Sequence, residues 1–242
     1  MEQETYRRMA EIQENHWWYE ARRRIIASLI EPLKLPANAE ILEVGCGPGA
    51  NLKMLKGFGN VVGVEPDDFS IDHARKVSGC RVEKGFLPDD LRVAGPFDLI
   101  GAFDVIEHVE PDRESLKTLY NLTKTGGHAL FTVPAYMFLW SQHDVVNHHK
   151  RRYVLPQFRD LLREAGFEVR FISYYNTLLF LLIAGVRMVK KLLRMKESPD
   201  DSLPRWPFVN TALCSIFAFE RYILKYTALP FGVSIVAVCR KA

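Results

Sequence analysis

Cysteine is scarce in this sequence, and its placement excludes two classes of protein. The 242 residues contain four cysteines, which lie far apart and form no Cys-x-x-Cys pair. A disulfide-stapled secreted domain and a structural zinc module both need closer, paired spacing. We therefore predict reduced thiols and a cytoplasmic protein.

Long apolar runs and a strong charge imbalance are also missing. No segment reaches the roughly 18 uninterrupted apolar residues of a membrane-spanning helix, and the polar residues 1–14 do not resemble a secretory signal. The net charge of +3 gives no indication of a nucleic-acid partner, because such proteins concentrate basic residues on one face. What is present is an ordinary globular composition, which suits one large domain.

A glycine-rich turn is the stretch around which the chain is organised. An apolar run that ends in Glu43 is followed by Gly45, Gly47 and Gly49, and then by a helical pattern. Glycines remove the side chains that would keep a ligand from the backbone, and the start of the following helix offers unpaired amide donors. The strand, turn and helix together predict a site for a small molecule.

A second carboxylate stands at a matching distance. Glu65 ends an apolar run and lies 20 positions after Gly45. Nucleotide-binding α/β units place an acid at about this distance, where it accepts hydrogen bonds from a ribose diol. Ligands of parallel sheets also bind beyond the carboxyl ends of strands. Glu65 is therefore a candidate ribose ligand.

Strand and helix patterns alternate along the chain. Strands are predicted at residues 40–44, 60–66, 81–86, 97–103, 128–133, 167–173 and 232–241. The helix over residues 112–123 is expected to stop at Gly126 and Gly127. The alternation predicts an α/β fold with a doubly wound, Rossmann-like sheet.

The order of these motifs resembles class I S-adenosylmethionine-dependent methyltransferases over about residues 39–133. The resemblance rests on the Glu43-x-Gly45-x-Gly47-x-Gly49 run, Glu65, the strand at 97–100 followed by Asp104-Val105-Ile106-Glu107-His108, and Gly126-Gly127 before a strand. It implies S-adenosylmethionine as cofactor, S-adenosylhomocysteine as product, and a seven-stranded, mostly parallel sheet with an antiparallel last strand.

The resemblance also implies the residues on the cofactor side. The methionine part would be supported by Glu43, Gly45, Gly47 and Gly49, the ribose hydroxyls by Glu65, the adenine by Phe86, and the methionine and reacting methyl group would be bordered by Phe103 and Asp104. The adenine side departs from the family pattern, because Phe86 and the glycine before it supply no acid.

A dinucleotide-binding oxidoreductase is the rival interpretation of the turn. Gly45-x-Gly47-x-x-Ala50 satisfies the looser glycine pattern of nicotinamide and flavin folds. Glu43 before the turn, Pro48 inside it and the order of the downstream strands favour the methyltransferase instead.

The densest polar and aromatic stretch, residues 134–153, leaves the carboxyl end of a strand and should lie over the pocket. Methyl transfer requires alignment of the acceptor, and a general base only where the acceptor loses a proton. His143 or His149 is the candidate base, and Asp144 would orient it. Candidates for acceptor binding are Trp17, Tyr136, Trp140, Arg151, Arg152 and Tyr153.

Arg151 and Arg152 suit an anionic group on the acceptor. The plain alternative is that the loop residues are solvated and that Trp17 packs in the core. A metal site at Asp144 and the loop histidines is not predicted, because oxygen-rich ligands do not obviously converge there.

The segment between the last two strands, residues 174–230, is far longer than a hairpin needs. Residues 178–186 are strongly apolar and are followed by five basic residues without an acid, namely Arg187, Lys190, Lys191, Arg194 and Lys196. One interpretation is a buried helical cap over the substrate pocket or a homodimer surface. The other is an interfacial helix at 178–196 on the inner membrane face, which would suit a lipid-linked acceptor.

We accordingly predict one structural domain with three parts: an N-terminal helical lid (1–38), a methyltransferase core (39–173 and 231–242) and a helical insertion (174–230). The predicted function is methyl transfer to a small-molecule, glycan or lipid-linked acceptor, preferentially at oxygen. The alternative from another class is a catalytically silent cofactor-binding or assembly protein on the same fold.

Overall fold

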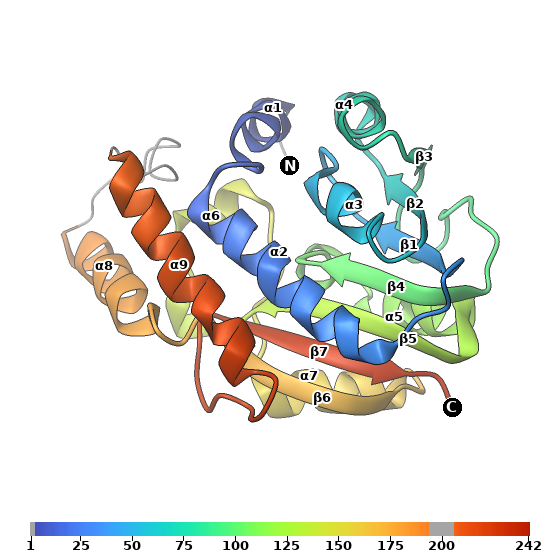
Figure 1. Ribbon diagram of the computed structural model, residues 1–242. Helices are drawn as coiled ribbons and strands as arrows, with labels where there is room; N and C mark the ends of the chain where they lie inside the picture. The colour runs from blue at the N-terminus through green and yellow to red at the C-terminus, as the bar shows by residue number, and fades with distance from the viewer. Residues whose placement is uncertain (1–2, 194–205) are drawn as a thin grey trace.

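Seven strands form one sheet in the order β3-β2-β1-β4-β5-β7-β6 (Figure 1). The computed structural model describes residues 3–193 and 206–242. The strands are β1 (Glu40–Val44), β2 (Asn60–Glu65), β3 (Arg81–Lys84), β4 (Phe97–Phe103), β5 (Thr123–Pro134), β6 (Glu168–Tyr175) and β7 (Ser234–Arg240). β7 runs antiparallel to β5 and β6, whereas β1 to β5 pair in parallel. The predicted Rossmann-like sheet with its antiparallel last strand is confirmed.

Helices cover both faces of this sheet. They are α1 (Gln3–Ile12), α2 (Trp17–Ile30), α3 (Ala50–Leu55), α4 (Asp68–Ser78), α5 (Asp112–Leu122), α6 (Gln142–Val146), α7 (Leu155–Glu164), α8 (Phe180–Leu192) and α9 (Pro207–Ile223). α2 and α9 cross the front of the sheet in Figure 1, and α5 and α7 lie behind it. Two separate apolar cores result, one under each layer.

Each core is built from apolar residues of the helices that cover that face of the sheet. On the front, Ile25 and Ile26 of α2 pack with Phe217 of α9 against the sheet. On the back, Leu116 of α5 and Phe158 of α7 are completely buried. Because apolar residues cover both faces of the central strands, the sheet is buried on both sides, as parallel sheets require. Only its edges and strand ends remain for a ligand.

The helix before β5 ends earlier than predicted. Thr123 has extended backbone angles (φ −73°, ψ 135°), and its hydroxyl donates to the Leu119 carbonyl at 2.8 Å. The branched side chain favours the extended conformation, and its hydroxyl adds a second hydrogen bond to a carbonyl that already accepts the Thr123 N–H. Gly126 and Gly127 therefore lie inside β5 and do not stop the helix.

The insertion is attached to the core through a buried carboxylate on α9. Glu220 is fully buried, and its oxygens accept hydrogen bonds from the backbone N–H groups of Asn176, Thr177 and Leu178 at 2.6, 2.6 and 2.8 Å. These amides follow directly after β6. One side chain thus ties the second helix of the insertion to the end of an edge strand.

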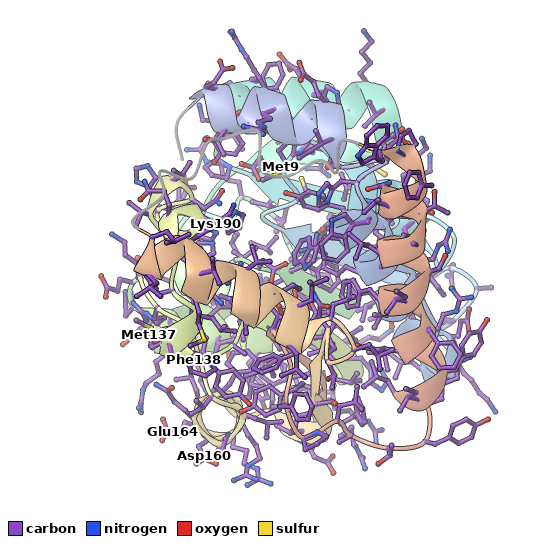
Figure 2. All side chains as sticks on the ribbon, turned by 90° about the vertical axis from the view of Figure 1, so that its left-hand side faces the viewer. Met9, Met137, Phe138, Asp160, Glu164 and Lys190 are labelled. Atoms are coloured by element: carbon purple, nitrogen blue, oxygen red, sulfur yellow. The ribbon has the colours of Figure 1, made fainter. Side chains whose placement is uncertain are left out.

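The first helix of the insertion, α8, has a packed side and an exposed side. Ala184 is buried together with Leu139 and Val233, and Figure 2 shows α8 beside the loop that carries Phe138. On the outer side Leu181 and Leu192 are 79% and 83% exposed. None of the helices within the described ranges is long and apolar enough to cross a membrane. Arg194 and Lys196 of the predicted basic cluster fall outside the described residues.

Replacement of Glu220 by alanine should destabilise the protein. The change leaves three buried or half-buried N–H groups without an acceptor, and we expect a loss of about 3 kcal/mol in the free energy of unfolding. Urea unfolding followed by circular dichroism measures it. Ser215→Ala, at an exposed position of the same helix, should change this free energy by no more than about 0.5 kcal/mol. Equal effects of the two variants would contradict the attachment.

Candidate functional site

The glycine turn lies at the carboxyl end of β1, between that strand and α3. Gly45, Gly47 and Gly49 all have positive φ angles, of 67°, 51° and 98°. A Cβ atom at Gly49 would lie 2.7 Å from the Cα of Ala74, so a side chain has no room there. The turn needs glycine for its conformation and for its close packing on α4. It therefore presents bare backbone at the edge of the sheet.

Glu65 ends β2 beside this turn and faces it. One carboxylate oxygen accepts the Gly47 N–H at 2.8 Å, and the other accepts the Asp67 N–H at 3.3 Å. Burial raises the pKa of Glu65 to about 7 despite these hydrogen bonds. Each carboxylate oxygen has a second lone pair, so the side chain can still accept hydrogen bonds from two hydroxyl groups. A ribose diol fits that requirement.

Glu43, at the end of β1, is a second buried acceptor. One of its oxygens accepts the Asn51 side-chain amide at 2.8 Å, and the other is buried with no hydrogen-bond partner among the described residues. Burial raises its pKa to about 8. An unsatisfied buried acceptor is costly unless a ligand donates to it. The turn, Glu43 and Glu65 thus fit a ligand that brings hydroxyl and amino donors.

α1 and the residue that follows it cover the turn. The sulfur of Met9 would lie 3.5 Å from a Cβ atom at Gly47, and the Gln13 side chain accepts the Ala50 N–H at 3.4 Å. Burial and the nearby charges of Glu65 and Asp67 raise the pKa of Tyr6. α1 therefore lies over the turn, within the segment 1–38 for which the sequence predicts a helical lid.

Asp104 follows β4 and is held by α2. Its carboxylate forms an ion pair with the buried Arg22 guanidinium, which lies 4.6 Å from the centre of the Trp18 ring. Its backbone has a φ of 58°, and its N–H donates to the Thr132 carbonyl at 2.9 Å. Arg22 was not predicted, because one of three consecutive arginines on a helix carries no sign of its partner.

The two predicted aromatic cofactor residues differ in position. Phe86 follows β3 and is 55% exposed, so its ring is accessible to a planar base. Phe103 is buried in the front core, with its ring against Gly101. The side chain of Phe103 therefore supports the sheet, and only its backbone is left to border a ligand.

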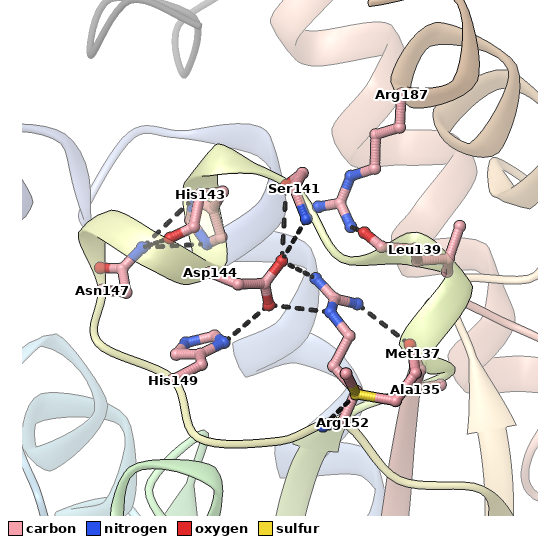
Figure 3. A network of polar contacts seen from close by, with 10 residues as sticks. All are labelled: Ala135, Met137, Leu139, Ser141, His143, Asp144, Asn147, His149, Arg152 and Arg187. Carbon is pink, nitrogen blue, oxygen red and sulfur yellow. Dashed lines mark hydrogen bonds and ion pairs between the residues drawn. The ribbon is translucent and has the colours of Figure 1, made fainter. Parts of the chain in front are cut away.

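A buried ionic network organises the loop after β5 (Figure 3). The Asp144 carboxylate pairs with Nδ1 of His149 at 2.8 Å and with two nitrogens of Arg152 at 2.8 and 2.9 Å, and it accepts the Ser141 N–H at 2.9 Å. Burial opposes ionisation, but the hydrogen bonds from His149 and Arg152 outweigh it and hold the pKa of Asp144 below its usual range. Asp144 thus orients His149, as a dyad requires.

The predicted anion-binding role of Arg152 is not supported by its position. Arg152 is only 5% exposed, and its third nitrogen donates to the Ala135 carbonyl at 3.0 Å. Tyr153, also predicted to bind the acceptor, is buried and donates to Asp112 at 2.9 Å. Both residues hold the loop in place because carboxylates and carbonyls from other segments complete their hydrogen bonds. This is a correction to the sequence interpretation.

Arg151 is also paired, but at the surface. It forms ion pairs with Glu110 and Asp112, both at 2.7 Å. Glu110 lies just before α5 and Asp112 is its first residue, so both acids meet the arginine only in the folded chain. An anionic acceptor would have to compete with both of them for Arg151.

The remaining predicted acceptor residues are half-buried aromatics. Tyr136 stacks on Tyr174, with ring centres 5.0 Å apart, and on Phe138 at 5.2 Å. Trp17 packs edge-on against Phe217 at 6.1 Å, so most of its contact is with the front core. Trp140 is half-buried at the end of the same turn as Phe138.

The histidines of the loop differ in burial and in the groups that contact them. His143 is exposed, lies 6.0 Å from the His149 ring and is contacted by the Asn147 amide. His149 is mostly buried and stands 4.6 Å, ring centre to ring centre, from His108. Of the two candidate bases, His149 is paired through Nδ1 with the Asp144 carboxylate.

Comparisons with known proteins agree with this geometry. The family described as "Methyltransferase domain" matches residues 17–170. A ubiquinone biosynthesis O-methyltransferase of Acinetobacter baylyi is 24% identical over 194 residues, which cover 67% of this chain and 82% of that protein.

Two solved structures illustrate the likeness of fold. A possible histamine N-methyltransferase from Thermotoga maritima has a TM-score of 0.59 at 19% identity, with 99% of this chain and 96% of that chain covered. Phosphoethanolamine N-methyltransferase 2 of Haemonchus contortus, in complex with S-adenosyl-L-methionine, has a TM-score of 0.57 at 15% identity, with 90% of this chain and 52% of that chain covered.

The family match covers well over half of the chain and includes the glycine turn, Glu65, Asp104 and the loop network. The dinucleotide-binding interpretation of the turn is thereby set aside. The chain belongs to the class I S-adenosylmethionine-dependent methyltransferases.

Proposed function

We propose that this protein transfers the methyl group of S-adenosylmethionine to an oxygen atom of a small or lipid-linked acceptor. The observation that carries the proposal is the pairing of Asp144 with His149, in a loop beside the carboxyl ends of β4 and β5. A carboxylate-oriented imidazole suits the removal of a proton from a hydroxyl group. The O-methyltransferase relative from Acinetobacter adds support for oxygen as the target.

The cofactor supplies an activated methyl group on a sulfonium centre, so the protein mainly aligns the reactants and excludes water. We assign the ribose to Glu65, the methionine part to Glu43 and the glycine turn, and the adenine to Phe86. Asp104, held by Arg22, would border the methyl group. α1 would exclude water from above the turn, since Met9 and Gln13 already contact it.

Cofactor binding should depend on Glu65 and on its ionisation. Glu65→Gln removes a charged acceptor for two hydroxyl groups, and we expect the Kd for S-adenosylmethionine to rise about 10- to 100-fold. The carboxylate is the accepting form and its pKa is about 7, so wild-type affinity should fall as the pH drops below 7. Titration calorimetry between pH 5.5 and about 8.5 measures both effects, a range chosen to bracket this ionisation.

The matched control is Glu114→Gln, at an exposed position of α5, which should bind like wild type. If the protonation of Glu65 causes the loss of affinity below pH 7, Glu65→Gln should not show that loss. Tyr6, Asp67 and Glu43 are the other titratable groups that face this carboxylate. Full affinity in Glu65→Gln would contradict the ribose assignment. No binding of S-adenosylmethionine by wild type at millimolar concentration would contradict the proposed function itself.

Turnover should depend on His149 more than on the exposed His143. With an active acceptor from a hydroxyl-compound screen, His149→Ala should lower kcat about 10²- to 10⁴-fold, the usual effect of a lost general base. S-adenosylhomocysteine release measures the rate. His148→Asn, at a neighbouring exposed position whose positive φ asparagine tolerates, should retain the wild-type rate. If His149→Ala and His143→Ala both keep full rate, neither is the base.

The acceptor side of the site points to an apolar or lipid-linked molecule. α8 packs against the aromatic turn of Tyr136 and Phe138, and its outer face exposes Leu181 and Leu192. α8 also carries basic residues and no acid. Apolar and basic residues without acids suit the surface of an anionic bilayer. We assign this outer face to a lipid surface from which the acceptor reaches the loop.

Binding to anionic vesicles should depend on the exposed residues of the outer face of α8. We expect co-sedimentation with phosphatidylglycerol vesicles at low salt, weakened by salt because each basic residue contributes about 1 kcal/mol. Leu181→Ser with Leu192→Ser should weaken binding at least about tenfold, because each leucine loses burial in the interface. Val154→Ser, at an exposed apolar position before α7, is the control. Salt-insensitive dimerisation without vesicle binding would assign the face to a second copy instead.

A further inference from the structure

Glu107 is a buried carboxylate that has no role in the proposed binding of the cofactor or activation of the acceptor. Its side chain is 0% exposed, and neither of its oxygens has a hydrogen-bond partner in the described part of the chain. A buried carboxylate without donors is unfavourable by several kcal/mol. Arginine and backbone donors satisfy Asp144 nearby, and Glu43 keeps one hydrogen bond, whereas both oxygens of Glu107 lack a donor among the described residues. A bound cation would supply the missing partner.

Two histidines converge on Glu107 from different segments. His108 is the next residue in the sequence, and His149 comes from the loop after α6. One ligand atom from each of the three side chains lies within 4.8 Å of the other two. The Lys150 N–H also donates to the Glu107 carbonyl at 2.8 Å, which joins the two segments next to the cluster. Small side-chain rotations would bring the three atoms onto one ion.

We infer that Glu107, His108 and His149 form a binding site for a divalent cation of the zinc or iron(II) class. Two imidazole nitrogens and one carboxylate oxygen are typical ligands of such ions, whereas magnesium and calcium prefer oxygen alone. Three protein ligands leave at least one coordination position for water or for a ligand oxygen.

The surroundings of His149 are those of a metal ligand. Its Nδ1 is paired with Asp144, so Nε2 is the nitrogen that remains for the ion. A carboxylate on the second imidazole nitrogen fixes the tautomer and the ring orientation at many metal sites. Arg152 and Ser141 in turn hold Asp144. The network in Figure 3 thus supports His149 from behind.

This inference deepens the proposed function, because it changes how His149 acts. A hydroxyl oxygen of the acceptor that binds the open position would lose its proton to solvent more readily, since a divalent cation stabilises the resulting alkoxide. His149 would then hold the ion and would not itself take the proton. Metal-independent turnover would point back to His149 as the base.

Metal titration of the chelator-dialysed full-length protein tests the site directly. We use cobalt(II), whose visible absorption reports coordination by protein ligands, and zinc(II) in calorimetry. Wild type should bind one equivalent of each ion. Glu107→Gln, which keeps the shape of the side chain, and His149→Ala should each weaken binding at least about tenfold, because each loses a direct ligand. His148→Asn is the control from the same loop, and asparagine tolerates its φ of 57°.

The outcomes separate this inference from the proposed function. Thermal unfolding of every variant and titration with S-adenosylmethionine are measured on the same samples. If the cofactor binds and Glu107→Gln takes up cobalt(II) like wild type, or wild type takes up none, the metal site is wrong and the methyltransferase proposal stands. If one equivalent of metal binds through Glu107 but the cofactor does not bind, the proposed function fails and the metal site stands.

Discussion

Buried carboxylates along the carboxyl edge of the sheet are the constraint on which the site depends. Glu43, Glu65, Glu107 and Asp144 are all nearly or completely shielded from solvent, and a buried carboxylate needs donors or a cation. These carboxylates differ in the number of hydrogen bonds that they accept. Asp144 has five donor contacts, Glu65 has two, Glu43 has one and Glu107 has none that the described residues provide. The acid with the most donors holds the loop together, and the others keep oxygen lone pairs for the ligands that we propose.

The cofactor side could be predicted from the sequence because its signals are local. Positive-φ glycines, a strand that ends in an acid and the spacing to Glu65 all lie within one β-α-β unit, where sequence distance determines spatial distance. The α5 end was misplaced by one residue, and its stop was assigned to the glycines although the chain is already extended at Thr123, whose hydroxyl donates to the Leu119 carbonyl. Such side-chain caps are hard to rank in advance.

The acceptor side could be predicted only in part, because its partners come from distant segments. The composition of residues 134–153 predicts a functional loop. In the folded chain, however, Arg152 bonds to Ala135 and Asp144, and Tyr153 bonds to Asp112, so both residues stabilise the loop. The sequence marks Glu107 only as one residue of the motif at 104–108. Its burial depends on how two loops pack, and no periodicity in the sequence reports that.

The N-terminal helices α1 and α2 contact different parts of the structure. Asn210 of α9 accepts the Trp17 N–H at 2.9 Å and donates to the Asn15 carbonyl at 2.8 Å, so it clamps the start of α2. α1 is separated from these hydrogen bonds by a short turn. It contacts the core mainly through Met9, Gln13 and its contacts with α4. α1 lies over the glycine turn, while Arg22 of α2 pairs with Asp104. The cover of the turn and the partner of Asp104 therefore belong to two consecutive helices of the N-terminal segment.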